Sequence, residues 1–122
     1  GYIAAEFSRI AARAGAQVTI LQRGGRMLPQ FDPDLVGWLV QNYRGAGIDV
    51  RTRTSVEGVE KTNAGFVVRA RSEADGGRPV AVEADLVVHA AGRVPDLDPL
   101  DLGAAGVERD GRGRLKLNEF LQ

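Results

Sequence analysis

The residues best suited to chemistry stand at the start of the chain. Gly1 and Ala4 have the spacing of the last two positions of a G-x-G-x-x-G/A turn, whose first glycine would fall two residues before Gly1. Such a turn opens a helix, and the free N–H groups and positive dipole end of that helix bind phosphate. The pattern indicates a phosphate-binding turn, although the same spacing also fits a glycine that only makes a turn.

The composition excludes several other chemistries. The chain has 122 residues, with 16 Lys and Arg, 16 Asp and Glu, one His and no Cys. The lack of cysteine excludes a disulfide scaffold, a thiolate metal site and a cysteine nucleophile. Asp96, Asp98 and Asp101 lack the ligand spacing of a calcium loop, so we expect no metal site.

Charge and hydropathy restrict the partners. A net charge of zero argues against broad capture of nucleic acid or of an anionic membrane. No apolar run approaches the roughly 20 residues that span a bilayer. The N-terminus also lacks the pattern of a signal peptide, so the expected location is cytoplasmic.

The first half of the chain alternates helix and strand patterns. A helix is predicted over residues 2–14, and its apolar face carries Ile3, Phe7, Ile10, Ala11 and Ala14. The run Val18–Leu21 is typical of a strand covered on both faces. Asp32 and Pro33 are suited to begin a second helix, which Gly45 and Gly47 end, and Ile48–Val50 begins another strand. This order predicts a parallel sheet with crossover helices.

Short strands follow. The segments 56–60, 66–71 and 80–83 have β character and are joined by turn residues, which predicts an antiparallel meander. Residues 85–89 are again typical of a buried strand, and a weak strand is predicted at 115–117. The predicted fold class is α/β: a Rossmann-like, three-layer domain with a parallel sheet and an antiparallel β-meander.

A Rossmann unit places a strand before its glycine turn. That strand would lie upstream of Gly1, and in this fold it is central. Burying about four apolar residues there would contribute roughly 6–12 kcal/mol, comparable with the net stability of a domain. We therefore expect the chain to be a piece of a longer one, or to receive this strand from another chain.

Four segments together resemble one family. They are residues 1–7, the strand at 18–21, Phe31-Asp32, and Ala91-Gly92-Arg93-Val94-Pro95. In this order they resemble the NAD(P)-binding domain of the flavoprotein pyridine nucleotide-disulfide oxidoreductases, the group of glutathione reductase, dihydrolipoamide dehydrogenase and mercuric reductase. The resemblance implies that residues 1–110 form the NAD(P)-binding domain and that residues 111–122 begin the return to an FAD domain.

The resemblance also implies residue roles. Gly1 and Ala4 would let the backbone approach the cofactor pyrophosphate, Tyr2 would gate the nicotinamide pocket, and Glu6 would pair with a lysine of the FAD domain beside the flavin. Val56 would lie beside the adenosine half of the cofactor, Gly92 near the nicotinamide, and Arg93 at the junction with the FAD domain. The full set of implied cofactor-binding positions is Gly1, Tyr2, Ile3, Ala4, Glu6, Gln22, Arg23, Arg26, Val56, Ala91, Gly92 and Arg93.

The family's FAD-binding glycine motif, redox-active cysteine pair and C-terminal His-Glu pair have no match in this sequence. The resemblance therefore implies no catalytic residue within these 122 residues, and a chain that is inactive by itself. FAD would be bound in the full-length enzyme, by a domain of the same polypeptide, and that enzyme would be a homodimer.

The end of the first predicted strand bears on the choice between NADPH and NADH. NAD-specific domains carry an acidic residue there, which accepts hydrogen bonds from the ribose hydroxyls. Here the position is Gln22, and Arg23 follows, matching an arginine that holds the 2′-phosphate in NADPH-dependent relatives. In those relatives a second arginine also binds the 2′-phosphate. The matching position here is Pro29, which cannot bind phosphate, and Arg26 could take its place. We therefore predict a modest preference for NADPH, with NADH still possible.

Other functions remain open at this point. An NADH oxidase, a ferredoxin reductase or a monooxygenase would share the same architecture. A non-catalytic module that senses NAD(H) could use the same unit. The terminal electron acceptor is not identified by the sequence.

Overall fold

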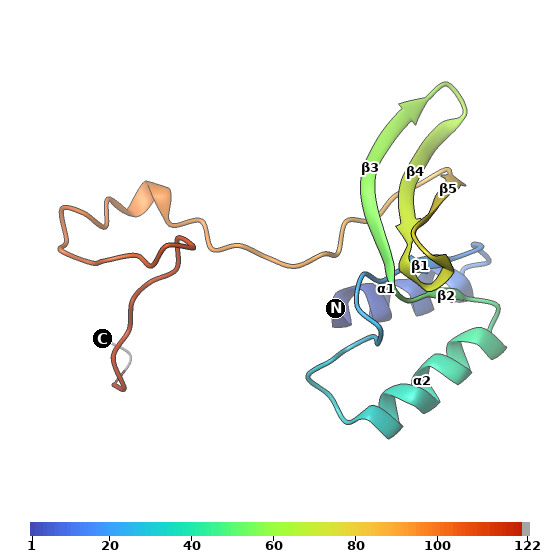
Figure 1. Cartoon of the computed structure of the whole chain (residues 1–122), viewed down its shortest axis with the longest axis horizontal. Coiled ribbons are helices and arrows are strands. Elements are labelled where there is room, and N and C mark those ends of the chain that lie inside the picture. The colour runs from blue at the N-terminus through green and yellow to red at the C-terminus, as the bar shows by residue number, and fades with distance from the viewer. Residues whose placement is uncertain (121–122) are drawn as a thin grey trace. The chain divides into compact units, whose positions relative to one another are not determined.

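The computed structural model describes residues 1–120, which divide into two units, Gly1–Ala91 and the segment from Gly92 onward. Each unit is described by itself. The first unit contains all the regular helices and strands: two α-helices, a pair of parallel strands and a three-stranded antiparallel sheet (Figure 1).

The parallel pair is built from two helix–strand repeats. Helix α1 spans Tyr2–Arg13, strand β1 Thr19–Leu21, helix α2 Pro33–Gly45 and strand β2 Asp49–Arg51. β1 and β2 pair in parallel, with Ile20 opposite Val50. The predicted order of helix, strand, helix and strand is therefore confirmed.

The helix ends follow from local sequence. The Asp32 carboxylate accepts hydrogen bonds from the N–H groups of Asp34 (2.9 Å) and Leu35 (3.1 Å), so it caps α2 as predicted. Both helices end in a Schellman motif: Ala16 N–H donates to Ala11 C=O after α1, and Ile48 N–H donates to Tyr43 C=O after α2. The turn residue is a glycine in each case, with φ +92° at 15 and +80° at 47.

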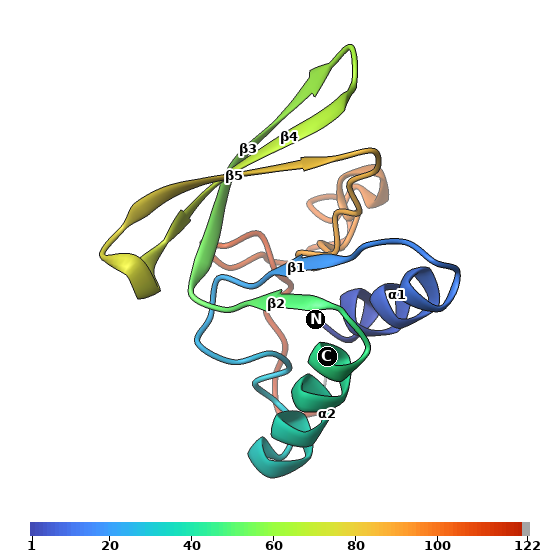
Figure 2. The ribbon, with the colours of Figure 1, turned by 90° about the vertical axis from the view of Figure 1, so that its right-hand side faces the viewer.

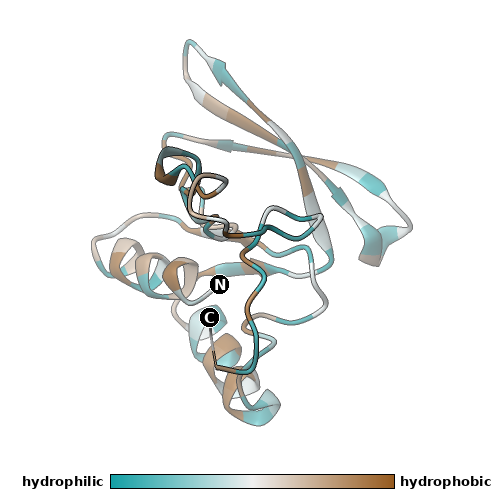
Figure 3. Ribbon diagram, turned by 90° about the vertical axis from the view of Figure 1, so that its left-hand side faces the viewer, coloured by the Kyte–Doolittle hydropathy of each residue, from teal (hydrophilic) through white to brown (hydrophobic). Residues whose placement is uncertain are grey.

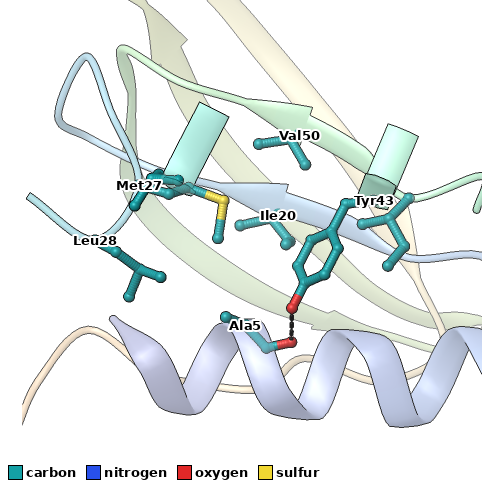
Figure 4. Packing of buried hydrophobic residues seen from close by; sticks show 8 residues of the cluster. Ala5, Ile20, Met27, Leu28, Tyr43 and Val50 are labelled. Carbon is teal, nitrogen blue, oxygen red and sulfur yellow. Dashed lines mark hydrogen bonds between the residues drawn. The ribbon is translucent and has the colours of Figure 1, made fainter. Parts of the chain in front are cut away.

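Both helices cover the same face of the parallel pair (Figures 2 and 4). The buried cluster contains Ile20 and Val50 from the strands, with Ala5, Met27, Leu28, Val36, Tyr43 and Ile48. The Tyr43 hydroxyl donates to the Ala5 carbonyl oxygen at 2.7 Å and so links α2 to α1 (Figure 4). The prediction that 18–21 is covered on both faces is wrong, because burial alternates: Thr19 is exposed and Ile20 is buried.

The buried face of α1 also differs from the prediction. The helix turns Ala5 and Ser8 inward, whereas Phe7 and Ile10 are 56% and 64% exposed. Small residues let α1 approach Tyr43 and the strands closely, whereas Phe7 and Ile10 line a surface groove. Figure 3 shows the hydropathy of the ribbon, with hydrophobic stretches along both helices.

The second sheet of this unit is the predicted meander, which is confirmed. Strands β3 (Thr54–Thr62), β4 (Gly65–Ser72) and β5 (Arg78–Ala84) pair antiparallel in that order, and a short 3-10 turn, η1 (Glu73–Asp75), joins the last two. Gly65 has φ +134°, and a Cβ there would lie 2.6 Å from the Ala84 carbonyl oxygen, so this turn requires glycine.

Cross-strand ion pairs stabilise this sheet. Arg69 donates to both carboxylate oxygens of Glu60, at 2.6 and 2.9 Å. The hydrogen bond from Arg69, followed by its positive charge, holds the pKa of Glu60 below its ordinary value of 4.5. The pair is exposed, so its contribution to stability is small.

The prediction of a strand at residues 85–89 is wrong. After β5 the chain runs without regular structure, and Leu86 and Val88 are 75% and 56% exposed. A strand needs a neighbouring backbone, and among residues 1–120 none pairs with this segment.

The second unit has little regular structure. It holds one short 3-10 turn, η2 (Asp98–Leu100), and an isolated antiparallel bridge between Arg109 and Leu115. The weak strand predicted at 115–117 is reduced to this single bridge. An ion pair of 2.8 Å joins Arg109 to Asp98 within the unit.

Two general properties concern residues 1–120 as a whole. None of their helices has the length and apolar character needed to cross a membrane. They also hold no cluster of three or more His, Cys, Asp or Glu side chains placed to bind a metal ion.

Candidate functional site

The start of α1 is open and carries free amide groups. Gly1 occupies the N-cap position without a capping side chain, and the first turn contains no acidic residue. The first backbone bond of the helix runs from Ala5 N–H to Gly1 C=O at 3.3 Å, so the N–H groups before Ala5 lack helical acceptors. A Cβ built on Gly1 would meet nothing within 4 Å. These features suit the approach of an anion such as a pyrophosphate.

The side chains of the first two turns of α1 differ in exposure. Tyr2 is 56% exposed, Ile3 and Ala4 are half-buried, and Glu6 is exposed. The Glu6 side chain makes no hydrogen bond or ion pair with residues 1–120. It lines a shallow surface groove with Phe7, Arg9, Ile10, Arg13 and Tyr43. Tyr2 and Glu6 are thus available to partners beyond these residues.

The second feature is the corner where β1 ends. Gln22 N–H donates to Arg51 C=O (2.9 Å), and Gln22 C=O accepts from Thr54 N–H (3.0 Å). Gly24 C=O accepts from Arg53 N–H at 3.0 Å. The chain after β1 is therefore bonded to the chain after β2. We call residues 22–26 together with 52–53 the arginine corner.

The loop that carries the arginine corner is anchored in the core. Met27 and Leu28 are only 3% and 8% exposed, and Figure 4 shows both directed at the space between α1 and the strands. One guanidinium nitrogen of Arg26 donates hydrogen bonds to the carbonyl oxygens of Pro29 (2.6 Å) and Phe31 (3.4 Å). Arg26 thus holds its own loop, and its role as a phosphate ligand stays a prediction.

The arginine corner and the start of α1 lie toward the same end of the parallel pair. A connection of a few residues joins α1 to β1, and the two run in opposite directions (Figure 2). The N-terminal end of the helix therefore accompanies the carboxyl end of the strand. In open α/β sheets ligands bind at that edge.

Arg53 is a residue of this corner that sequence reasoning missed. It follows β2, and the carboxyl ends of parallel strands share one sheet edge, so a basic residue after β2 was a usable indication.

The remaining predicted positions belong to other segments of the chain. Val56 is on β3, two residues beyond Thr54, 50% exposed and at the β-bulge of that strand. Ala91 ends the first unit, and Gly92 and Arg93 open the second, where Gly92 has φ +124° with open space around it. All three are exposed. The structure thus brings the corner residues together, and it describes Gly92 and Arg93 only within their own unit.

The family profile described as pyridine nucleotide-disulphide oxidoreductase matches residues 1–122. The chain belongs to this family. It is 32% identical to leghemoglobin reductase of Glycine max over 119 residues, which are 98% of this chain and 23% of that protein. It is also 32% identical to mercuric reductase of Staphylococcus aureus, over 100% of this chain and 22% of the relative.

Solved structures agree with this family membership. The Cu(II) complex of the HOCl-induced flavoprotein disulfide reductase RclA from Escherichia coli matches with a TM-score of 0.77 and 30% identity, over 100% of this chain and 26% of that one. An engineered water-forming NADPH oxidase bound to NADPH matches with a TM-score of 0.75 and 26% identity, over 93% of this chain and 23% of that one. The predicted α/β fold class is confirmed.

The chain spans about a quarter of the length of the relatives it matches. Members of the family are oxidoreductases that depend on FAD and NAD(P).

Proposed function

We propose that this chain is the NAD(P)H-binding domain of an FAD-dependent disulfide oxidoreductase and that it binds NADPH in preference to NADH. The observation that carries the proposal is the pairing, at one end of the parallel strands, of an uncapped helix start with the arginine corner. The residues present fit the cofactor: amides without acceptors suit its pyrophosphate, and open space at Gly1 admits it. When bound, the nicotinamide supplies the hydride that reduces FAD.

Most of the predicted residues have a role in this proposal. Backbone N–H groups of residues 1–4 bind the pyrophosphate, and Tyr2 covers the nicotinamide pocket. Glu6, exposed and without a partner among residues 1–120, pairs with a lysine of the FAD domain. Val56 contacts the adenosine half. Ala91 and Gly92 approach the nicotinamide, and Arg93 stands at the junction with the FAD domain.

The preference for NADPH rests on Gln22 and Arg23. Gln22 is neutral, so it does not repel a 2′-phosphate as a carboxylate would. Arg23 is exposed and has no ion-pair partner within the described chain, so its guanidinium is free to bind that phosphate. The engineered oxidase bound to NADPH gives a parallel, because its substitutions replace an aspartate by alanine and introduce two arginines. The parent oxidase is described as bound to NADH.

The rest of the enzyme follows as a proposal from the family. Residues 1–110 form the nucleotide-binding domain, and residues 111–122 begin the return to an FAD domain of the same polypeptide. The enzyme is a homodimer in the cytoplasm, and the 122 residues are inactive by themselves. The acceptor is a disulfide or a related group.

A second candidate function is supported by the same comparisons. The structures that match this chain include a water-forming NADH oxidase and a putidaredoxin reductase in complex with putidaredoxin. An oxidase or a ferredoxin-type reductase would use the same nucleotide site with another acceptor.

Titration of the chain with NADPH and NADH tests the proposal. We expect the wild-type protein to bind NADPH more tightly than NADH. Arg23→Ala should weaken NADPH binding by about tenfold or more, because a charge-assisted phosphate contact is lost, and should change NADH binding little. Isothermal titration calorimetry measures both affinities.

Arg13→Ala is the matched control, because Arg13 is an exposed arginine in the last turn of α1, at the far end from the N-terminus. It should alter neither affinity. A wild-type chain that binds neither nucleotide would defeat the proposed function, and tighter binding of NADH would defeat the cofactor preference alone.

A further inference from the structure

A second guanidinium reaches the arginine corner from the chain after β2. A Cβ built on Gly25 would lie 3.4 Å from Nε of Arg53 and 4.0 Å from one of its terminal nitrogens. The Arg53 side chain therefore lies directly against the Gly24-Gly25 turn. Its position follows from tertiary structure, since Arg53 comes 28 positions after Gly25 along the chain.

The backbone of Arg53 is held in place on both sides. Its N–H donates to Gly24 C=O at 3.0 Å, and its C=O accepts from Glu73 N–H at 2.8 Å. Its φ is +51°, which is uncommon for a residue with a side chain and costs free energy. Strained positions of this kind cluster at ligand-binding sites. The two hydrogen bonds hold the Arg53 backbone and so fix the direction of its Cα–Cβ bond.

The other arginines nearby are already engaged. Arg51 pairs with Asp49, with Nε and Oδ2 2.7 Å apart. Arg26 donates to the carbonyl oxygens of its own loop. Arg53, like Arg23, is exposed and makes no ion pair with any residue from 1 to 120. The corner thus holds two guanidinium groups, those of Arg23 and Arg53, that make neither a hydrogen bond nor an ion pair with any residue from 1 to 120.

We propose that Arg53 is the second arginine that binds the 2′-phosphate of NADPH, together with Arg23, and that it takes the part for which Pro29 is unsuited. This inference rests on the proposed function and adds a specificity-determining residue to it. A phosphate monoester dianion offers several acceptor oxygens, so two guanidinium groups from separate loops can share it. NADH lacks this phosphate, so the contribution of Arg53 is confined to NADPH.

The test compares two arginines on the same connection. In Arg53→Asn the charge is removed by a residue that tolerates positive φ, so the fold is kept. Arg51→Asn is the matched control, because its guanidinium is paired with Asp49. Titration calorimetry with NADPH and NADH is run on wild type and on both variants, and thermal unfolding checks that the three proteins are equally folded.

We expect Arg53→Asn to weaken NADPH binding by about tenfold, the effect of one lost charge-assisted contact, and to change NADH binding less than about twofold. Arg53→Lys should recover part of the lost affinity, since it restores the charge without the planar fork. Arg51→Asn should leave both affinities within about twofold of wild type.

Three results would overturn the assignment: unchanged NADPH affinity in Arg53→Asn, an equal loss for NADPH and NADH, or a loss in Arg51→Asn as large as in Arg53→Asn. If Arg23→Ala weakens NADPH while Arg53→Asn does not, the proposed function stands and only Arg53 is rejected. If the wild-type chain binds neither nucleotide, the proposed function fails, and the role of Arg53 fails with it.

Discussion

The parallel pair and the antiparallel sheet of the first unit use their strands in opposite ways. β1 and β2 have three residues each and depend on helices packed on one face, whereas β3 has nine residues and is held by neighbours and exposed ion pairs. The parallel strands end at a shared edge, and there the structure gathers the arginine corner. The antiparallel strands alternate in direction, so the residues at their ends are spread over both sides of the sheet. Parallel topology thus concentrates side chains that can bind one ligand, and the meander serves as scaffold.

The largest expected effect comes from a change in the parallel half of the first unit, which is β1 and β2 with the helices packed on them. Tyr43 is 5% exposed in the core between α1, α2 and the strands, and its hydroxyl binds Ala5. Tyr43→Ala should lower the free energy of unfolding by about 3–5 kcal/mol, through lost burial and the cavity that remains. Chemical denaturation of both proteins measures the difference.

Tyr43→Phe separates the two contributions, since it removes the hydroxyl alone and should cost about 1 kcal/mol. A loss in Tyr43→Ala no larger than in Tyr43→Phe would show that packing at this position contributes little and that the parallel half does not depend on its helices.

An intermediate effect is expected in the meander. Gly65→Ala places a Cβ 2.6 Å from the Ala84 carbonyl oxygen at φ +134°, and the strain should lower the free energy of unfolding by about 1–3 kcal/mol. Chemical denaturation measures this loss as well. Gly58→Ala in β3 is the control, because a Cβ there meets nothing within 4 Å. Equal stability of Gly65→Ala and wild type would contradict the tight turn between β3 and β4.

The smallest effect concerns the ion pair of the meander. The folded-state pKa of Glu60 is lowered by Arg69, so the pair stabilises the protein above the ordinary pKa of 4.5, and this contribution is lost as the pH falls through the lower folded-state value. Glu60→Gln should therefore lower the unfolding temperature slightly at pH 7 and make no difference well below pH 4.5. Thermal unfolding at several pH values measures the change.

Glu83→Gln on β5 is the control, because Glu83 has no ion-pair partner in residues 1–120. Its unfolding temperature at pH 7 should match that of wild type. A Glu60→Gln protein whose deficit persists at low pH would mean that the side chain acts through packing and not through its charge.

The sequence predicted those parts of the fold that depend on neighbours along the chain. The cap at Asp32 and the glycine turns after both helices follow from local backbone requirements. The meander follows from turn residues between short β segments. It did not predict which side of α1 is buried, because the larger side chains, Phe7 and Ile10, are on the exposed side.

The candidate site divides in the same way. Gly1, Gln22 and Arg23 could be identified from sequence, since each lies at the junction of a predicted strand or helix. Arg53 could not, because its proximity to Gly25 depends on hydrogen bonds between the segments that follow β1 and β2. The prediction of a strand at 85–89 was wrong because a strand also needs a partner backbone. Its apolar composition suits a sheet, but no described strand pairs with it.

By itself the sequence determined the order of helices and strands, the helix caps and the glycine-dependent turns, because backbone sterics and local hydrogen bonds act within a few residues. Tertiary structure decided which helix face is buried, how many strands pair, and which arginines share the corner after β1. Those outcomes depend on contacts between residues far apart in the chain, whose free energy exists only when the segments meet.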